Sequence, residues 1–405
     1  MQEETPAIFD QGFVMKKTTK LFCLTAILAL TACSSSMRYF QGQDDWYRDL
    51  RQSGWQASGA NKQIVTQVIN RIEAKNQNQD TRFDLATSEY KSGNWHYEWD
   101  SAGQQANADG DFLAASMYYT IAAYPFINEQ PRSNDSYQNA LKNYQQAVES
   151  DGSVLEQITV STQDGEAKAF LHLPKQQPNK VMPVLVMTNG SDHALTQLYP
   201  IYRDYIKQAG WAMVTFDLPG LGSNNSFAQH TDRTNVIHQQ LIQKLKQDPR
   251  LQPDKIVLMG KSFGGNAAIK TAFTNSDDIA GAISWCGAVN GPFLKFGFIM
   301  TLLPDMTRDA LLSRFDLPQE QLSQQGSALA LSNQYLGKIK TKVPMLAINQ
   351  GNDKISPVSD MRLIAESSTQ GKYVIVEEDI TQGHCSSDSL TMPLVVNWLN
   401  QQFPI

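Results

Sequence analysis

A serine stands between two glycines directly after an apolar run. The segment Gly260-Lys261-Ser262-Phe263-Gly264 follows the apolar residues 256–259, and the stretch 265–270 after it, rich in small residues, is expected to be a helix. Glycines on both sides allow the backbone to bend sharply from a strand into a helix and expose the serine hydroxyl, an arrangement called a nucleophile elbow. We therefore predict that Ser262 is a nucleophile. The alternative is a serine in a glycine-rich loop without chemistry.

A serine hydroxyl is a weak nucleophile near neutral pH, so it needs a base and a third group that orients the base. In chains with this elbow the order is serine, acid, histidine. Histidines occupy positions 96, 172, 193, 230, 238 and 384, and only His384 follows Ser262. We predict that His384 is the base, on a loop that returns over the elbow.

The acid is expected after the apolar strand 345–349. Asp353 lies just beyond this strand, in a turn that contains Gly351 and Asn352. Asp360 is expected to cap the next helix. Asp379 is so near His384 in sequence that a single turn of the chain would have to position both side chains. Asp353 is therefore the predicted acid, with the other two as alternatives.

The oxyanion of a tetrahedral intermediate needs preorganised backbone donors. The amide of Phe263, directly after the nucleophile, is one expected donor. The other is the amide of Ser191, because the loop after the strand 184–187 contains a glycine turn at Gly190. Lys261 could face either substrate or solvent.

Residues 151–405 alternate strands with helices. A hairpin around Asp164-Gly165 opens this region. Further strands are expected at 184–187, 213–216, 256–259, 280–286, 345–349 and 373–376, and helices at about 197–209, 236–247 and 390–402. This order predicts a mostly parallel mixed sheet with helices on both faces, the α/β-hydrolase fold.

Three other segments complete the predicted organisation. Residues 33–150 are expected to form a tether and a helical cap domain, whose Trp and Tyr residues pack a core rather than a ligand cage. Residues 288–338 are too long for a structureless loop and are expected to form a helical insertion over the site. Residues 1–32 are expected to be an upstream extension, with Met15 as the true start, and a signal peptide.

The signal region has the pattern of a lipoprotein leader. A basic stretch, 15–20, precedes an apolar stretch, 21–30, and Leu30-Thr31-Ala32-Cys33 resembles a bacterial lipobox, in which the cysteine is lipidated after cleavage. The apolar stretch is too short for a lasting membrane span. We predict a lipid anchor at Cys33 in the cell envelope, on the periplasmic side of the outer membrane; a plain secretory signal is the alternative.

Cysteine usage and charge limit the other functions. Cys286 lies in an apolar run and is expected to be a buried thiol, although an oxidising periplasm would permit a disulfide with Cys385. The chain has neither C-x-x-C nor H-E-x-x-H spacing, so no metal site is predicted. A net charge of -6 gives no basic surface for nucleic acid.

Several motifs together resemble one family. Segments 182–192, 216–223 and 260–266, with the cap segments 95–99, 110–111 and 122–126, resemble the fermentation/respiration switch protein family of esterase-like α/β-hydrolases. The resemblance implies a helical N-terminal cap and hydrolysis of small-molecule esters or, as in related enzymes, of carbon-carbon bonds in β-diketones.

The sequence thus predicts a serine hydrolase without a cofactor, and most directly a carboxylesterase acting on a small or medium ester. Hydrolysis of a ketone by the same triad is one alternative. A non-catalytic envelope lipoprotein that binds a ligand on a hydrolase scaffold is another.

Overall fold

The computed structural model describes residues 52–75, 89–126, 131–175, 180–303, 305–353, 355–377 and 384–405. The predicted lipoprotein signal with Cys33, and the alternative acid Asp379, lie outside these residues. Within them, no helix combines the length and apolar character needed to cross a membrane.

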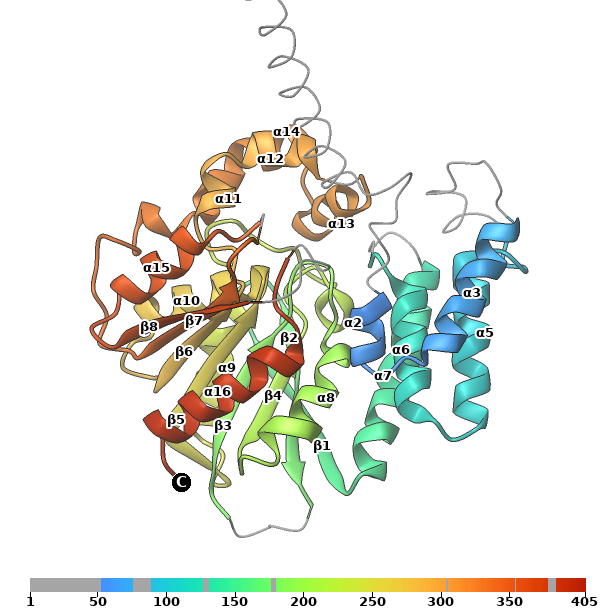
Figure 1. Cartoon of the computed structure of the whole chain (residues 1–405), viewed down its shortest axis with the longest axis horizontal. Helices are drawn as coiled ribbons and strands as arrows, with labels where there is room; N and C mark the ends of the chain where they lie inside the picture. The colour runs from blue at the N-terminus through green and yellow to red at the C-terminus, as the bar shows by residue number, and fades with distance from the viewer. Residues whose placement is uncertain are drawn as a thin grey trace, which may run out of the picture.

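An eight-stranded mixed sheet forms the centre of the molecule (Figure 1), in the order β1-β2-β4-β3-β5-β6-β7-β8. The hairpin β1/β2 and the pair β2/β4 are antiparallel, and all other neighbours are parallel. The strands are β1 (Ser153–Ser161), β2 (Glu166–Pro174), β3 (Met182–Thr188), β4 (Ala212–Phe216), β5 (Leu251–Lys261), β6 (Gly281–Trp285), β7 (Met345–Gln350) and β8 (Gly371–Val376). The predicted α/β-hydrolase fold class is confirmed.

Helices cover both faces because the central strands are buried on both sides. One face packs against α9 (Val236–Leu245), α10 (Phe263–Thr274) and α15 (Val358–Glu366). The other packs against α16 (Asp388–Gln402) and a helical segment of η1 (Leu195–Leu198), α8 (Tyr199–Ile201) and η2 (Tyr202–Ile206).

The predicted single helix at 197–209 is wrong in form, because η1 is a 3-10 helix and η2 is a π-helix. Pro200 lies in the first turn of α8, where its missing N–H is tolerated. Because it has no N–H, Pro200 cannot donate the backbone hydrogen bond that would continue η1. The segment thus consists of short pieces on both sides of the proline.

The N-terminal helices lie beside the sheet (Figure 1). They are α2 (Gln52–Ala57), α3 (Lys62–Lys75), α5 (Trp95–Ala108), α6 (Phe112–Ala123) and α7 (Pro131–Ser150). Trp55, Trp95 and Trp99 are buried and pack edge to face or tilted, with 5.8 Å between the ring centroids of Trp55 and Trp99. The indole of Trp95 donates to the carbonyl of Ile121 at 2.8 Å. The aromatic residues therefore form a core, as predicted.

Hydrogen bonds join these helices to the loops that follow β3 and β4. The hydroxyl of Tyr137 donates to Asp217 at 2.6 Å, and the amide of Leu195 donates to the same carboxylate at 2.7 Å. Thr120 and Thr196 share a further bond of 2.7 Å. The cap helices are thus fixed against the carboxyl edge of the sheet.

Four helices between β6 and β7 lie over one end of the sheet (Figure 1). They are α11 (Gly291–Leu294), α12 (Phe296–Leu302), α13 (Asp305–Phe315) and α14 (Gln319–Gln325), followed by the 3-10 turns η4 (Gly326–Leu329) and η5 (Leu331–Asn333). The predicted cap role of Asp360 is wrong, because α15 begins at Val358 and leaves Asp360 inside its first turn. Its carboxylate instead accepts from the amides of Asn290 and Gly291 at 3.0 and 2.8 Å, which fastens the start of the insertion.

Candidate active site

Ser262 lies in a sharp turn between β5 and α10. Its backbone has φ 52° and ψ −121°, a conformation that an L-residue seldom adopts. A side-chain carbon at Gly260 would collide with the carbonyl of Gly264, and one at Gly264 would lie 2.5 Å from Oγ1 of Thr188. The two glycines are therefore required by the close approach of backbone, and the serine side chain is held at the end of β5.

Three adjacent strands end together at this point. Register pairs Lys261 with Trp285 and Trp285 with Ile348. The amide of Ser262 donates to the carbonyl of Trp285 at 2.9 Å, and that of Cys286 donates to Ile348 at 2.7 Å. Residues that follow β5, β6 and β7 thus share one edge of the sheet.

Ser262, His384 and Asp353 form a continuous hydrogen-bonded chain. Nε2 of His384 lies 2.8 Å from Oγ of Ser262, and Nδ1 lies 2.9 and 3.0 Å from the two carboxylate oxygens of Asp353. With the proton on Nδ1, Nε2 can accept the serine proton. The structure therefore brings together the three side chains that the sequence analysis selected.

Asp353 is buried and accepts three backbone hydrogen bonds. The amides of Ile355 and Ser356 each donate to one carboxylate oxygen at 2.8 Å, and the amide of Cys385 donates to the other at 2.9 Å. Burial alone would raise the pKa of Asp353, but the charge and hydrogen bond of His384, together with the backbone donors, hold the pKa below its ordinary value. The carboxylate is therefore ionised at neutral pH.

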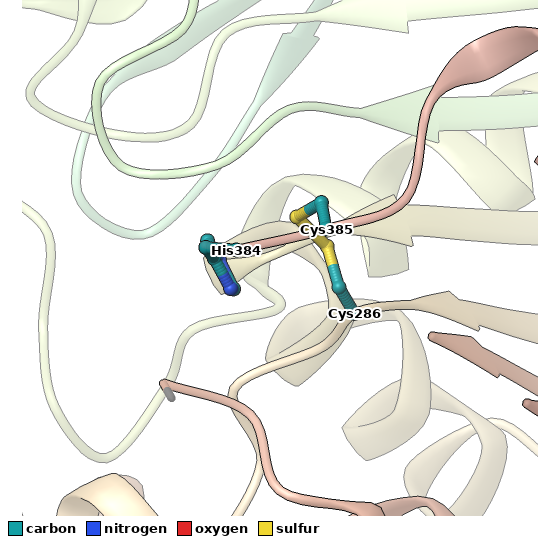
Figure 2. Close-up of side chains that lie close together, drawn as sticks. All are labelled: Cys286, His384 and Cys385. Atoms are coloured by element: carbon teal, nitrogen blue, oxygen red, sulfur yellow. A yellow bond between two sulfur atoms is a disulfide. The ribbon is translucent and has the colours of Figure 1, made fainter. Parts of the chain in front are cut away.

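A disulfide joins Cys286, at the end of β6, to Cys385, directly after the histidine. Figure 2 shows it beside His384. The expectation of a free thiol at Cys286 is wrong, although the residue is buried as predicted. The two Cα atoms lie 5.0 Å apart, within the usual range for a disulfide. The two sulfur atoms and a ring nitrogen of His384 are close together, but the paired sulfurs leave no thiolate for a metal.

The two predicted oxyanion donors belong to segments that lie close to Ser262. Phe263 follows Ser262 at the start of α10, and a side-chain carbon at Gly190, beside Ser191, would lie 2.9 Å from Cβ of Ser262. Within the described ranges, neither the amide of Phe263 nor that of Ser191 donates to a protein acceptor. Both donors are therefore available near the serine.

Lys261 faces protein rather than the serine. Its ammonium lies 3.8 Å from the centroid of the Trp285 ring and 3.4 Å from the carboxylate of Asp388. The indole of Trp285 in turn donates to the hydroxyl of Ser386 at 3.2 Å. These contacts hold Ser386 and Asp388, which follow His384 in the chain, against Trp285 and Lys261.

A pocket lies between the cap and the loop that follows β3. Its walls include Trp55, Tyr124 and Phe126 from the cap and Asp192 and His193 from the loop. Asp192 and His193 directly follow the predicted donor Ser191. The pocket therefore adjoins the site from the side of the cap.

Two features of this region have no clear signal in the sequence. Two cysteines far apart in sequence do not show whether the fold brings them together as a disulfide. The other feature is Arg314, a fully buried arginine on α13. No motif marks it, since a single arginine in a helix is usually exposed.

Comparisons with known proteins agree on one family. The profile described as "Esterase FrsA-like" matches residues 4–403. The protein named Esterase FrsA from Photobacterium profundum is 30% identical over 416 residues, which cover 97% of each chain. Its counterpart from Vibrio cholerae serotype O1 (strain M66-2) is 30% identical over 379 residues and 89% of each chain.

Solved structures show the same fold at lower identity. AbyA5 matches 81% of this chain and 94% of its own, with a TM-score of 0.66 and 19% identity. The 2,6-dihydroxy-pseudo-oxynicotine hydrolase matches 87% of this chain and 95% of its own, with a TM-score of 0.63 and 17% identity. The match to the profile and to the curated relatives extends over nearly the whole chain, which is therefore a hydrolytic enzyme and belongs to the FrsA-like esterase family.

Proposed function

We propose that this enzyme hydrolyses small or medium carboxylic esters through Ser262, His384 and Asp353 and a covalent acyl-enzyme. The observation that supports this most strongly is the hydrogen-bonded chain from Oγ of Ser262 through the imidazole to a buried, ionised carboxylate. In a structural role these side chains would not need a strained serine backbone at the end of a strand.

The proposed reaction has two halves. Oγ of Ser262 attacks the ester carbonyl while Nε2 of His384 takes its proton, and Asp353 orients the ring and stabilises the imidazolium. The amides of Phe263 and Ser191 donate to the oxyanion. Collapse of this intermediate releases the alcohol, which takes the proton from His384, and water then attacks the acyl-enzyme by the same route. The scheme uses only groups of this chain and water.

Ester turnover by Ser262→Ala tests this function. Wild-type enzyme should hydrolyse p-nitrophenyl esters of short and medium acyl chains, and Ser262→Ala should lower kcat by at least about 10³-fold with little change in thermal stability. A β-diketone substrate tests the alternative of carbon-carbon bond hydrolysis. Undiminished ester turnover in a folded Ser262→Ala variant would contradict the proposal, and absence of turnover in the wild type would favour the ligand-binding alternative.

We further propose that the enzyme is lipid-anchored at Cys33 in the bacterial envelope, facing the periplasm. The Cys286–Cys385 disulfide supports this, because such bonds persist mainly in oxidising compartments. Cells that express the full chain should incorporate radiolabelled palmitate into the enzyme and retain it in the membrane fraction. Cys33→Ser should abolish both the palmitate label and the retention in the membrane fraction. A Cys33→Ser variant that was still labelled and membrane-bound would contradict the proposed lipid anchor.

A further inference from the structure

Arg314 carries a guanidinium that is buried in the interior of the enzyme. The side chain, on α13 of the insertion, is 1% exposed. Among the described residues, none accepts a hydrogen bond from Nε, Nη1 or Nη2. Burying such a group without acceptors is costly, so an open set of guanidinium donors indicates an acceptor that binds there.

The backbone of Arg314 is held firmly in place. Its carbonyl accepts from the amide of Gln229 at 2.9 Å. Gly220, in the loop after β4, packs so closely that a side-chain carbon there would lie 2.8 Å from Cγ of Arg314 and would collide with its carbonyl. The arginine is therefore built into this position.

The charges of two acids, Asp192 and Asp217, act on the guanidinium, although neither accepts a hydrogen bond from it. Burial lowers the pKa of Arg314 to about 10, opposed by the charges of Asp192 and Asp217, so the side chain is a cation at neutral pH. Asp217 already accepts from Tyr137, Leu195 and Ser223. Asp192 lies 3.1 Å from Nδ1 of His193. The acids offset part of the charge but leave the guanidinium donors open.

Arg314 borders the proposed catalytic site. The next residue, Phe315, packs edge to face on Phe263, with 6.1 Å between the ring centroids. Asp192, whose charge acts on the guanidinium, follows Ser191 and lines the pocket beside the cap. In Figure 1, α13 lies on the side of the insertion that is nearest the cap helices. Arg314 thus lies on a helix that contacts the residue after Ser262 and the loop after β4, at the edge of the sheet where α/β enzymes bind their substrates.

We propose that Arg314 binds a carboxylate of the substrate, so that the enzyme prefers esters that carry a second, free carboxylate. This inference rests on the proposed esterase function. The planar guanidinium can donate two parallel hydrogen bonds to a carboxylate, which matches its open donors better than a single acceptor does. The burial of the side chain lowers the local dielectric, which strengthens such a pair.

Matched esters with and without the charge test the proposal. The substrates are mono-p-nitrophenyl glutarate, its methyl ester and p-nitrophenyl valerate, assayed with wild type, Arg314→Gln, Arg314→Lys and the control Arg362→Gln, which removes an exposed cation on α15. We expect wild type and the control to favour the free acid in kcat/KM by at least about tenfold. Arg314→Gln should remove the preference by raising KM for the acid, while the two neutral esters change less than about threefold. Arg314→Lys should restore part of it.

The inference would be overturned if wild type showed no preference for the free acid. It would also be overturned if folded Arg314→Gln lost kcat/KM equally for all three esters. An equal loss of kcat/KM for the free acid and its methyl ester would indicate a neutral acceptor and would overturn it too. If wild type hydrolyses none of the esters, the proposed esterase function fails first. Glutarate provides a test that needs no Arg314 variant. It should slow fluorophosphonate labelling of wild-type Ser262 competitively, whereas dimethyl glutarate should not, and equal effects of the two compounds would contradict the carboxylate site.

Discussion

The two sides of the nucleophile are held in different ways. On the histidine side, formed by residues 349–356 and 384–388 with Cys286, the reacting groups are hydrogen-bonded to one another and to backbone amides, and a disulfide ties the loop to the sheet. On the insertion side, formed by Arg314 and Phe315 against Phe263, a buried cation has no bound acceptor among the described residues. We therefore expect the proposed chemistry to be preorganised by the protein, and the proposed carboxylate site to be completed only when substrate binds.

The largest effect should follow from replacing His384, the central residue of the histidine side. His384→Gln should lower kcat by about 10³- to 10⁶-fold, because the serine loses its base. Since the base acts on every substrate, the loss should be equal for neutral and carboxylate-bearing esters. A loss confined to one class of ester, measured by steady-state kinetics, would contradict the division between the two sides.

Asp353→Asn should have the next largest effect. The amide cannot stabilise the imidazolium and favours the wrong tautomer, so kcat should fall by about 10³- to 10⁴-fold with KM nearly unchanged. Asp360→Asn is the matched control, since Asp360 was the alternative acid and instead binds the start of the insertion. Its effect should be on stability. If kcat fell more in Asp360→Asn than in Asp353→Asn, the assignment of Asp353 as the acid would be wrong.

Breaking the disulfide should affect both stability and rate. It closes a sequence separation of 99 residues, and its loss should destabilise the fold by about 2–5 kcal/mol. Because Cys385 adjoins His384 and donates to Asp353, kcat should also fall, by up to about 10²-fold. Wild type with and without reductant should show this in thermal melts and ester kinetics. The Cys286→Ala, Cys385→Ala double variant should not respond to reductant, and a response there would point to another target.

The smallest effect concerns acid stability. The pKa of Asp353 lies below its unfolded value, so its ionisation stabilises the fold fully above the unfolded pKa of about 3.9, and this stabilisation is lost as the pH falls through the folded pKa. Asp353→Asn should therefore lose less stability than wild type between about pH 4 and pH 2. Chemical denaturation across this range measures the difference, with the exposed Asp277→Asn as control. If the free energy of unfolding fell equally with pH in wild type and in Asp353→Asn, this expectation would be contradicted.

Local patterns in the sequence predicted which three side chains the structure brings together, while their catalytic roles stay a prediction. Glycines 260 and 264 mark the elbow because backbone crowding excludes other residues there. His384 could be found by elimination, and Asp353 from its place after a strand. The fold class followed from the alternation of apolar strands and helices.

Other features depend on contacts between distant segments. Asp360 was expected to cap its own helix, but the insertion folds back onto it. The disulfide depends on the path of the histidine loop, and the burial of Arg314 depends on the packing of α13 against the loop at Gly220. No local pattern records such contacts.

The most direct test of the central claim is mass spectrometric mapping of the adduct formed with a fluorophosphonate. We expect one adduct per chain on Ser262, absent in Ser262→Ala and formed far more slowly in His384→Gln. An adduct on another residue, or labelling of Ser262 at an unchanged rate without His384, would contradict the account.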